Sequence, residues 1–384
     1  MKKLLCIIIC LTLCCLTGCG DETVSSAITS TDSTKAPIEA VVPHKTVVLR
    51  DNSVTNSELE IAYLSAFTQI SYYVETSGKE YEIIETTEQN ALTDMIAQAV
   101  DGAKTFICIG SIFSEAVKLC SQSYANLNFV IFDGIIPENE VAKNVLQFSF
   151  AYDEAGFIIG YGLVNAGMRN IGFISEQPGY YENEIIKGIV AGAGYAANEK
   201  NNPPVSSDVS STVSSNVSSA VTSPSPNKTE IKITIEKYLL NNLNAAQMTT
   251  ALDIRKDLKN FRLVCIGDTA ASTLAEHPGQ FYMLTDSSVE YPRKHLQFGI
   301  GGEFDIIGEL EKISTAGDGW AATYGGRTVR LSVAQGNITF PVFKLSTTNL
   351  AKAKAILSNP TTDLNSDRMK KGYGYVTQTE YKAS

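Results

Sequence analysis

The chain has 384 residues, of which 44% are hydrophobic, so it is long enough to bury a large core or to form two domains. Acidic residues outnumber basic residues by 41 to 31, and the formal net charge is −10. This acidic balance excludes nucleic acid as a partner, and it excludes a polybasic patch that would bind a membrane surface.

The N-terminus has the layout of a secretory signal. Two lysines, Lys2 and Lys3, precede an apolar run from Leu4 to Leu16, which is too short to span a bilayer. The run ends Leu16-Thr17-Gly18-Cys19, which resembles the bacterial lipobox, where a cysteine after small residues receives a lipid such as palmitate. We predict a signal peptide over 1–18 and a lipid on Cys19 that anchors the chain to the extracytoplasmic face of the cell membrane. An ordinary cleaved signal is the alternative.

The remaining cysteines and the histidines do not suggest catalysis or metal binding. Beyond Cys19 only Cys108, Cys120 and Cys265 remain, an odd number without the spacing of metal ligands. We predict Cys108 and Cys265 to be buried, because both lie in apolar runs. None of the three histidines is spaced with Cys, Asp or Glu as a metal site requires, and no nucleophile elbow or phosphate loop is present. We therefore predict neither an enzyme, nor a metal, nor a cofactor.

Two polar segments are predicted to lack a packed core. Residues 19–44 are rich in Ser, Thr and Ala and form a flexible tether. A second segment, at about 200–228, repeats valine every fourth residue from Val205 to Val221 with Ser-Ser between. So polar a run buries too little surface to offset its ordering entropy, which indicates a disordered surface insert. A linker between domains is the alternative.

Between these segments the first part of the chain alternates strands and helices. The expected strands are 46–49, 81–84, 105–109 and 129–132, and the expected helices are 59–74, 90–100 and 114–121. Short apolar runs without alternation are typical of parallel strands that are covered on both faces. The pattern predicts a doubly wound α/β lobe over 45–148.

The same pattern then restarts. The expected helices are 155–166, 181–197 and 245–258, and the expected strands are 170–174, 231–235, 262–266 and 281–284. We predict a second lobe over 149–285, with 286–384 returning to complete both lobes. Two doubly wound parallel sheets in succession predict a ligand cleft between the carboxyl ends of their strands.

Several short motifs resemble the basic membrane protein family of bacterial substrate-binding lipoproteins, also called purine nucleoside receptors. The resemblance is most specific over roughly residues 105–195. Its motifs are Asn144-Val145, Glu154-Ala155-Gly156 with Gly160, Ile171-Gly172-Phe173, and Gly188-x-x-x-Gly192-Ala193. A later stretch from Gly319 to Phe340 is similar to the closing β-hairpin of that family.

The resemblance implies a type I periplasmic-binding fold and a lipid-anchored solute-binding receptor. It further implies a small-molecule ligand, expected to be a nucleoside, and an ABC permease as the partner. Two alternatives stay open: a sensor that is read by a membrane signalling partner, and a degenerate surface lipoprotein without a ligand.

The resemblance also indicates ligand-binding residues. The first loop of the family carries a polar stretch with an aromatic residue; here Asp51, Ser53 and Asn56 keep the polar positions, with one extra residue and no aromatic. The third strand ends in Gly110-Ser111-Ile112-Phe113, which makes Ser111 a contact and Phe113 the residue that stacks on a base. Asp268 ends a later strand and is expected to accept hydrogen bonds from sugar hydroxyls.

Each of these residues also has a structural alternative. The polar first loop could be a plain turn, Phe113 could belong to the core, and Asp268 could cap a helix. Weaker candidates are Asp133, Tyr180, Tyr181 and Trp320, which could equally cap a turn or pack.

Overall fold

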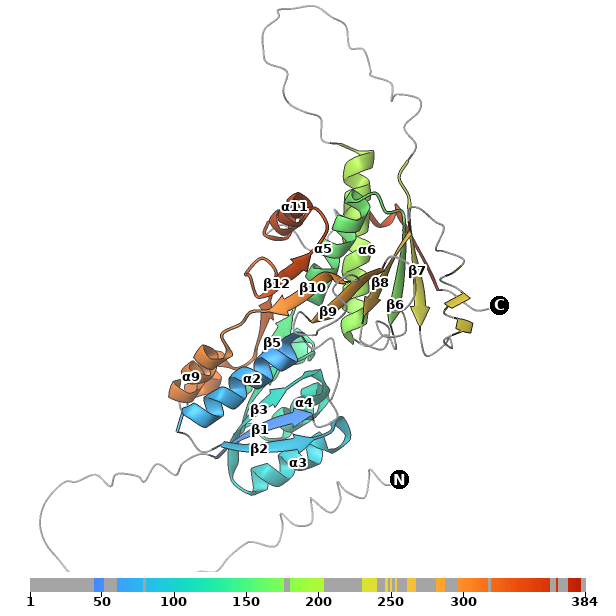
Figure 1. Cartoon of the computed structure of the whole chain (residues 1–384). Helices are drawn as coiled ribbons and strands as arrows, with labels where there is room; N and C mark the ends of the chain where they lie inside the picture. Colours follow the sequence, from blue (N-terminus) through green and yellow to red (C-terminus); the bar gives the residue numbers. More distant parts are fainter. Residues whose placement is uncertain are drawn as a thin grey trace, which may run out of the picture. The chain divides into compact units, whose positions relative to one another are not determined.

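A computed structural model describes most of the chain after the predicted tether (Figure 1). The described residues are 45–51, 61–78, 81–175, 180–203, 230–239, 246–247, 249–250, 253, 261–266, 281–286, 296–316, 319–359, 364 and 372–380. All of them belong to one compact unit, His44–Ser384. The predicted signal, the tether and the centre of the serine-rich insert lie outside the described residues.

The described strands form two sheets. Sheet A contains β1 (Lys45–Asp51), β2 (Tyr81–Thr86), β3 (Ala103–Ile109), β4 (Asn128–Phe132), β5 (Val145–Phe150) and β11 (Arg327–Leu331). Its spatial order is β11-β5-β4-β3-β1-β2, and every neighbouring pair is parallel.

Sheet B has the order β12-β10-β9-β8-β6-β7-β13. Its strands are β6 (Asn170–Ser175), β7 (Ile233–Leu239), β8 (Phe261–Ile266), β9 (Phe281–Asp286), β10 (Leu296–Gly302), β12 (Ile338–Phe343) and β13 (Val376–Glu380). All neighbours are parallel except β10 and β12, which are antiparallel. Two mainly parallel sheets in an α/β protein confirm the predicted fold class.

The helices begin and end within a few residues of most expected positions. They are α2 (Ile61–Thr76), α3 (Glu88–Val100), α4 (Ser114–Ser123), α5 (Tyr152–Asn165), α6 (Tyr180–Asn201), α9 (Ile306–Ala316), α10 (Trp320–Tyr324) and α11 (Thr347–Leu357). Two short 3₁₀ turns are η1 (Ser111–Phe113) and η2 (Glu138–Glu140). Most of the helix expected over 245–258 lies outside the described residues.

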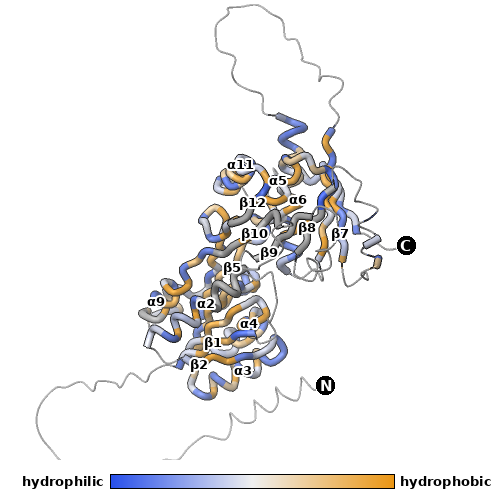
Figure 2. The backbone as a smooth tube through the Cα atoms, viewed as in Figure 1, coloured by the Kyte–Doolittle hydropathy of each residue, from blue (hydrophilic) through white to orange (hydrophobic). Residues whose placement is uncertain are grey.

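The strands of sheet A are covered on both faces, which explains their unbroken apolar runs. In β1, Val47 and Leu49 pack into one hydrophobic cluster, and Val48 packs into another on the opposite face. Cys108 is fully buried in β3, as predicted. Figure 2 shows hydrophobic residues along the strands, with hydrophilic residues concentrated on outer helical turns and loops.

The chain crosses between the two sheets three times. The crossings follow β5, β10 and β11, since β11 lies in sheet A and β12 lies in sheet B. The expected closing β-hairpin is therefore wrong. β11 extends sheet A by pairing in parallel with β5, and β12 pairs with β10, so residues 332–337 form a connection between sheets instead of a hairpin turn.

Backbone hydrogen bonds join the three crossings to one another. The Ala151 amide donates to the Leu331 carbonyl over 2.9 Å, and the Glu303 amide donates to the Asn337 carbonyl over 2.8 Å. The Gln69 side chain of α2 fastens the second crossing, because its amide nitrogen donates to the Phe304 carbonyl over 3.0 Å and its oxygen accepts from the Ile306 amide over 3.1 Å. Hydrogen bonds thus link the three crossings into one unit.

Glycines bring α5 and α6 into backbone contact. A Cβ added at Gly156 or Gly160 would collide with the carbonyl oxygen of Ile185 or Ile189 on α6. A Cβ at Gly192 would collide with the Phe157 carbonyl oxygen on α5. The two helices therefore touch backbone to backbone, and α5 is buried on nearly all sides.

Candidate functional site

Sheet A changes winding direction between β1 and β3. From β1 the chain proceeds to β2 on one side, whereas β3 and β4 follow on the other, and ligands bind at such a point in open α/β sheets. The carboxyl ends there carry two of the predicted site residues. Asp51 ends β1 and is buried, and Ser111 follows β3 after Gly110, whose φ of 110° favours glycine.

A pocket of about 190 Å³ opens beside this point. Ser111 lines it together with Glu88, Glu115, Lys118 and Pro137. The lining is mixed, because Ile112, Ile135 and Ile136 also contribute to it. The predicted contact of Ser111 with a ligand stays a prediction.

Sheet B has the equivalent change of direction between β6 and β8. Ser175 ends β6 with its side chain fully buried, and its hydroxyl finds no hydrogen-bond partner in the part of the chain that the structure describes. Asp268 follows β8 by two residues and lies outside the described residues, as do Ser53 and Asn56.

Asp133 lies where the carboxyl end of sheet A meets the second sheet's helices. It follows β4, is 2% exposed, and has a φ of 62°, a left-handed conformation that Asp tolerates better than most residues. The Tyr152 hydroxyl at the start of α5 donates to its carboxylate over 2.8 Å. Burial raises the pKa of Asp133 to about 6, against the opposing effects of Tyr152, Tyr181 and the Phe150 backbone.

Aromatic rings surround this carboxylate. The Tyr152 and Tyr181 rings meet edge to face with centroids 4.7 Å apart, and the Tyr180 ring packs against Tyr181 at 5.7 Å. Tyr180 remains 41% exposed, so one ring of the group presents a surface to solvent. Burial is the main cause that raises the pKa of Tyr180 to about 12, so its hydroxyl stays a neutral donor at physiological pH.

An ionic cluster lies beside the tyrosines and joins the first and third crossings. Arg330 on β11 donates to Asp153 on α5 over 2.6 Å, and Glu154 lies 3.6 Å from the same guanidinium. Glu154 also accepts from the Val333 amide over 2.9 Å. Burial disfavours the charged guanidinium, but the two carboxylates raise the pKa of Arg330 above its ordinary value. The cluster thus holds the first and third crossings together next to Asp133.

Phe113 occupies the core rather than a surface. Its side chain is fully buried in the cluster that includes Phe106 and Val117. The structural alternative for Phe113, a place in the core, is therefore the one observed, and its predicted stacking on a base is wrong. Trp320 is likewise buried, packed in the larger cluster.

Three polar residues of the site were not identified from the sequence: Tyr152, Ser175 and Arg330. Ser175 could have been identified from the sequence, because it is a polar residue at the end of an apolar run. The same reasoning selected Asp268. Tyr152 and Arg330 carried none, because their contacts depend on how the crossings pack.

The arrangement supplies hydrogen-bond donors, acceptors and an exposed ring, which suit binding of a polar ring compound. Among the described residues, no three His, Cys, Asp or Glu side chains gather as metal ligands would. A search of the described helices also finds none with the length and apolar character of a membrane span.

Comparison with known proteins identifies a family. The profile of the Bmp family, described as ABC transporter substrate-binding protein PnrA-like, matches residues 47–237. Basic membrane protein D of Borreliella burgdorferi is 30% identical over 109 residues, which cover 28% of this chain and 32% of that protein. Basic membrane protein A2 of Borrelia garinii subsp. bavariensis is 25% identical over 165 residues, which cover 43% of this chain and 48% of that protein. The chain thus matches less than half the length of either relative.

Solved structures agree on the fold. An ABC transporter solute-binding protein from Conexibacter woesei superposes with a TM-score of 0.53 at 13% identity, covering 84% of this chain and 98% of that protein. The family consists of substrate-binding proteins, which agrees with the prediction that the chain is not an enzyme. Over residues 47–237 the chain belongs to the Bmp family of PnrA-like ABC transporter substrate-binding proteins, with two α/β sheets of the type I periplasmic-binding kind.

Proposed function

We propose that the protein captures a nucleoside outside the cell membrane and delivers it to an ABC importer. One observation carries the proposal: the Tyr180 ring is 41% exposed and belongs to a group of tyrosines, of which Tyr152 is held by the buried Asp133 carboxylate. An exposed aromatic face among hydroxyl groups suits stacking on a nucleoside base.

Each site residue has a proposed role. Asp268 accepts hydrogen bonds from ribose hydroxyls, and Asp51, Ser53, Asn56 and Ser111 contact the polar edge of the base. Asp133 is 2% exposed, so it positions Tyr152 and does not touch the ligand itself. We assign the stacking surface to Tyr180, because its ring is 41% exposed whereas Phe113 is fully buried.

A titration of the unit His44–Ser384 with nucleosides, free bases, sugars and amino acids tests this function. We expect one or more nucleosides to bind and to raise the melting temperature, because a ligand that binds only the folded state stabilises it. Asp268→Ala should weaken binding about tenfold or more, since it removes hydrogen bonds of about 1.5–3 kcal/mol. Melting curves of the variant serve as the control for folding. If sugars or amino acids bind and no nucleoside does, the proposed ligand class is wrong.

The membrane location rests on Leu16-Thr17-Gly18-Cys19. We propose that Cys19 carries the lipid that holds the protein at the extracytoplasmic face. Replacing Cys19 by Ala should abolish incorporation of labelled fatty acid and release the protein from the membrane fraction. Cys120→Ala is the matched control and should leave labelling unchanged, because Cys120 is buried in the folded unit. Continued labelling of the Cys19 variant would contradict the anchor.

A further inference from the structure

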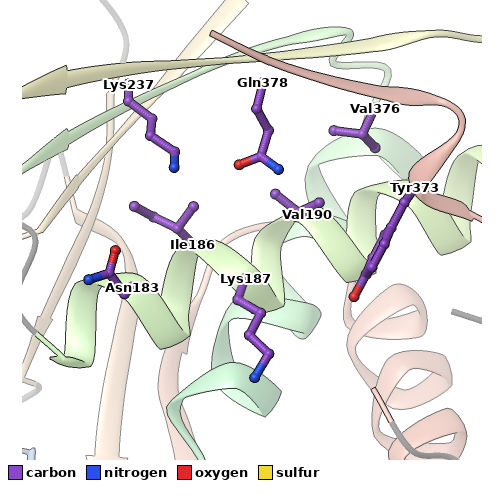
Figure 3. A pocket seen from close by; sticks show the side chains of 8 residues that line it. All are labelled: Asn183, Ile186, Lys187, Val190, Lys237, Tyr373, Val376 and Gln378. Atoms are coloured by element: carbon purple, nitrogen blue, oxygen red, sulfur yellow. The ribbon is translucent and has the colours of Figure 1, made fainter. Parts of the chain in front are cut away.

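A second cavity lies on sheet B, away from the residues described above. It is a groove of about 250 Å³ between α6 and the edge strands β7 and β13 (Figure 3). Drug-sized ligands occupy pockets of roughly 300–1,000 Å³, so this groove suits a smaller molecule. None of the site residues proposed for the nucleoside lines it.

The floor of the groove is apolar. Ile186 and Val190, one helical turn apart on α6, are 4% and 6% exposed, and Val376 of β13 faces them. The Tyr373 ring closes one end of the groove. Its hydroxyl is already used, because it donates to the Leu364 carbonyl over 3.1 Å. This end therefore offers hydrophobic surface.

The other end of the groove carries the amine of Lys237 on β7. The preceding residues on the same face of this strand are apolar and buried. Side chains alternate along β7, so Lys237 shares a face with Ile233 and Ile235, which are both buried. Figure 3 shows Lys237 and the Gln378 amide reaching toward the apolar floor, with Lys187 extending away from Lys237. Lys237 is only partly buried, so its stem can lie along this face while its amine reaches solvent and can meet an anionic partner there.

The described residues do not supply that partner. No hydrogen bond or ion pair joins the Lys237 amine to any residue that the structure describes, and this includes Glu380, its register neighbour on β13. Lys187 differs, because it pairs with Glu184 over 3.3 Å. Lys237 is thus the cation in the groove that is available to a ligand.

We propose that the groove binds a small carboxylate with a short apolar body. The carboxylate accepts a charge-assisted hydrogen bond from Lys237 and a second hydrogen bond from the Gln378 amide. The apolar body lies along Ile186 and Val190 toward Tyr373. This site is separate from the nucleoside site, and it does not depend on that proposal.

The test compares four six-carbon probes on the unit His44–Ser384 by ligand-observed NMR. The probes are hexanoate, hexyl phosphate, hexanol and hexylamine, which share one chain and differ in charge. We expect hexanoate to bind with a dissociation constant on the order of 1 mM, as befits so small a ligand, and the neutral and cationic probes to bind at least tenfold more weakly. Equal binding of hexanol, or binding of hexyl phosphate alone, would overturn the carboxylate assignment.

Variants then locate the site. Lys237→Met keeps the aliphatic stem and should weaken hexanoate binding about tenfold, whereas Lys232→Met should leave it unchanged, since Lys232 is exposed and paired with Glu230. Gln378→Trp fills the groove from an exposed position and should also abolish binding, which keeps the test valid if the first variant misfolds. Asp133→Asn should retain hexanoate binding. Unchanged affinity in both the Lys237 and Gln378 variants would overturn the proposal.

Discussion

Gly192→Ala should destabilise the folded unit by about 3 kcal/mol, as measured by urea unfolding. The added Cβ would overlap the Phe157 carbonyl oxygen, and a backbone atom of a buried helix has no room to retreat. Overpacking usually costs about 1–3 kcal/mol, and a clash with backbone belongs at the upper end of that range. Because the backbones of α5 and α6 touch at Gly192, the two helices must separate to admit the methyl group.

Gly319→Ala is the matched control for this experiment. Gly319 has a φ of −76°, and apart from its chain neighbours no atom of the described residues lies within 4 Å of the position that a Cβ would take. Its replacement should leave the free energy of unfolding within about 0.5 kcal/mol of the wild type. Equal effects of the two substitutions would show that α5 and α6 pack less closely than the structure indicates.

Asp133→Asn should make the protein more stable at neutral pH. Burial raises the pKa of Asp133 to about 6, so the folded state favours the protonated carboxyl more than the unfolded state does. This contribution to stability is present below pH 4, falls as the pH rises from about 4 to 6, and stays lost above that range. About two pKa units correspond to about 3 kcal/mol. Asn cannot ionise and accepts the Tyr152 hydrogen bond, so it escapes this loss.

The measurement is the free energy of unfolding of both proteins between pH 4 and pH 8. The difference between variant and wild type should grow from pH 4 to pH 6 and then level off. Asp101→Asn is the control, because Lys45 lowers the pKa of this exposed carboxyl, so its stability contribution changes mainly below pH 4 and the difference from wild type should stay nearly constant over this range. A constant difference across the pH range would refute the raised pKa of Asp133.

The fold was predicted well wherever an element follows from its own residues alone. Short apolar runs such as the one ending at Ile109 become strands covered on both faces, because each face needs its own apolar row. Gly156 and Gly160 act for an equally local reason, because each lies where α5 touches the α6 backbone. The expected hairpin near Tyr324 failed, since strand pattern alone does not say which sheet a strand joins.

The candidate site was predicted only in part, for a related physical reason. Ser111 follows a strand, and the sheet direction alone brings it to the binding edge. Phe113 is two residues further on, where the turn of η1 directs its ring into the core. Tyr152 and Arg330 reach Asp133 and Asp153 through the crossings, and no pattern within one segment encodes such contacts.

The threefold crossing has a consequence for how the chain is made. Arg330 pairs with Asp153, a partner 177 positions earlier, and sheet B is finished only by β13 near the end of the chain. Sheet A therefore lacks its edge strand β11 until Leu331 has been made, and sheet B lacks β13 until Glu380 has been made. A chain that ends before β11 would leave β5 as an unpaired edge, and one that ends before β13 would leave β7 unpaired; such edges can recruit strands from other molecules. Truncated chains should thus aggregate in place of forming one working lobe.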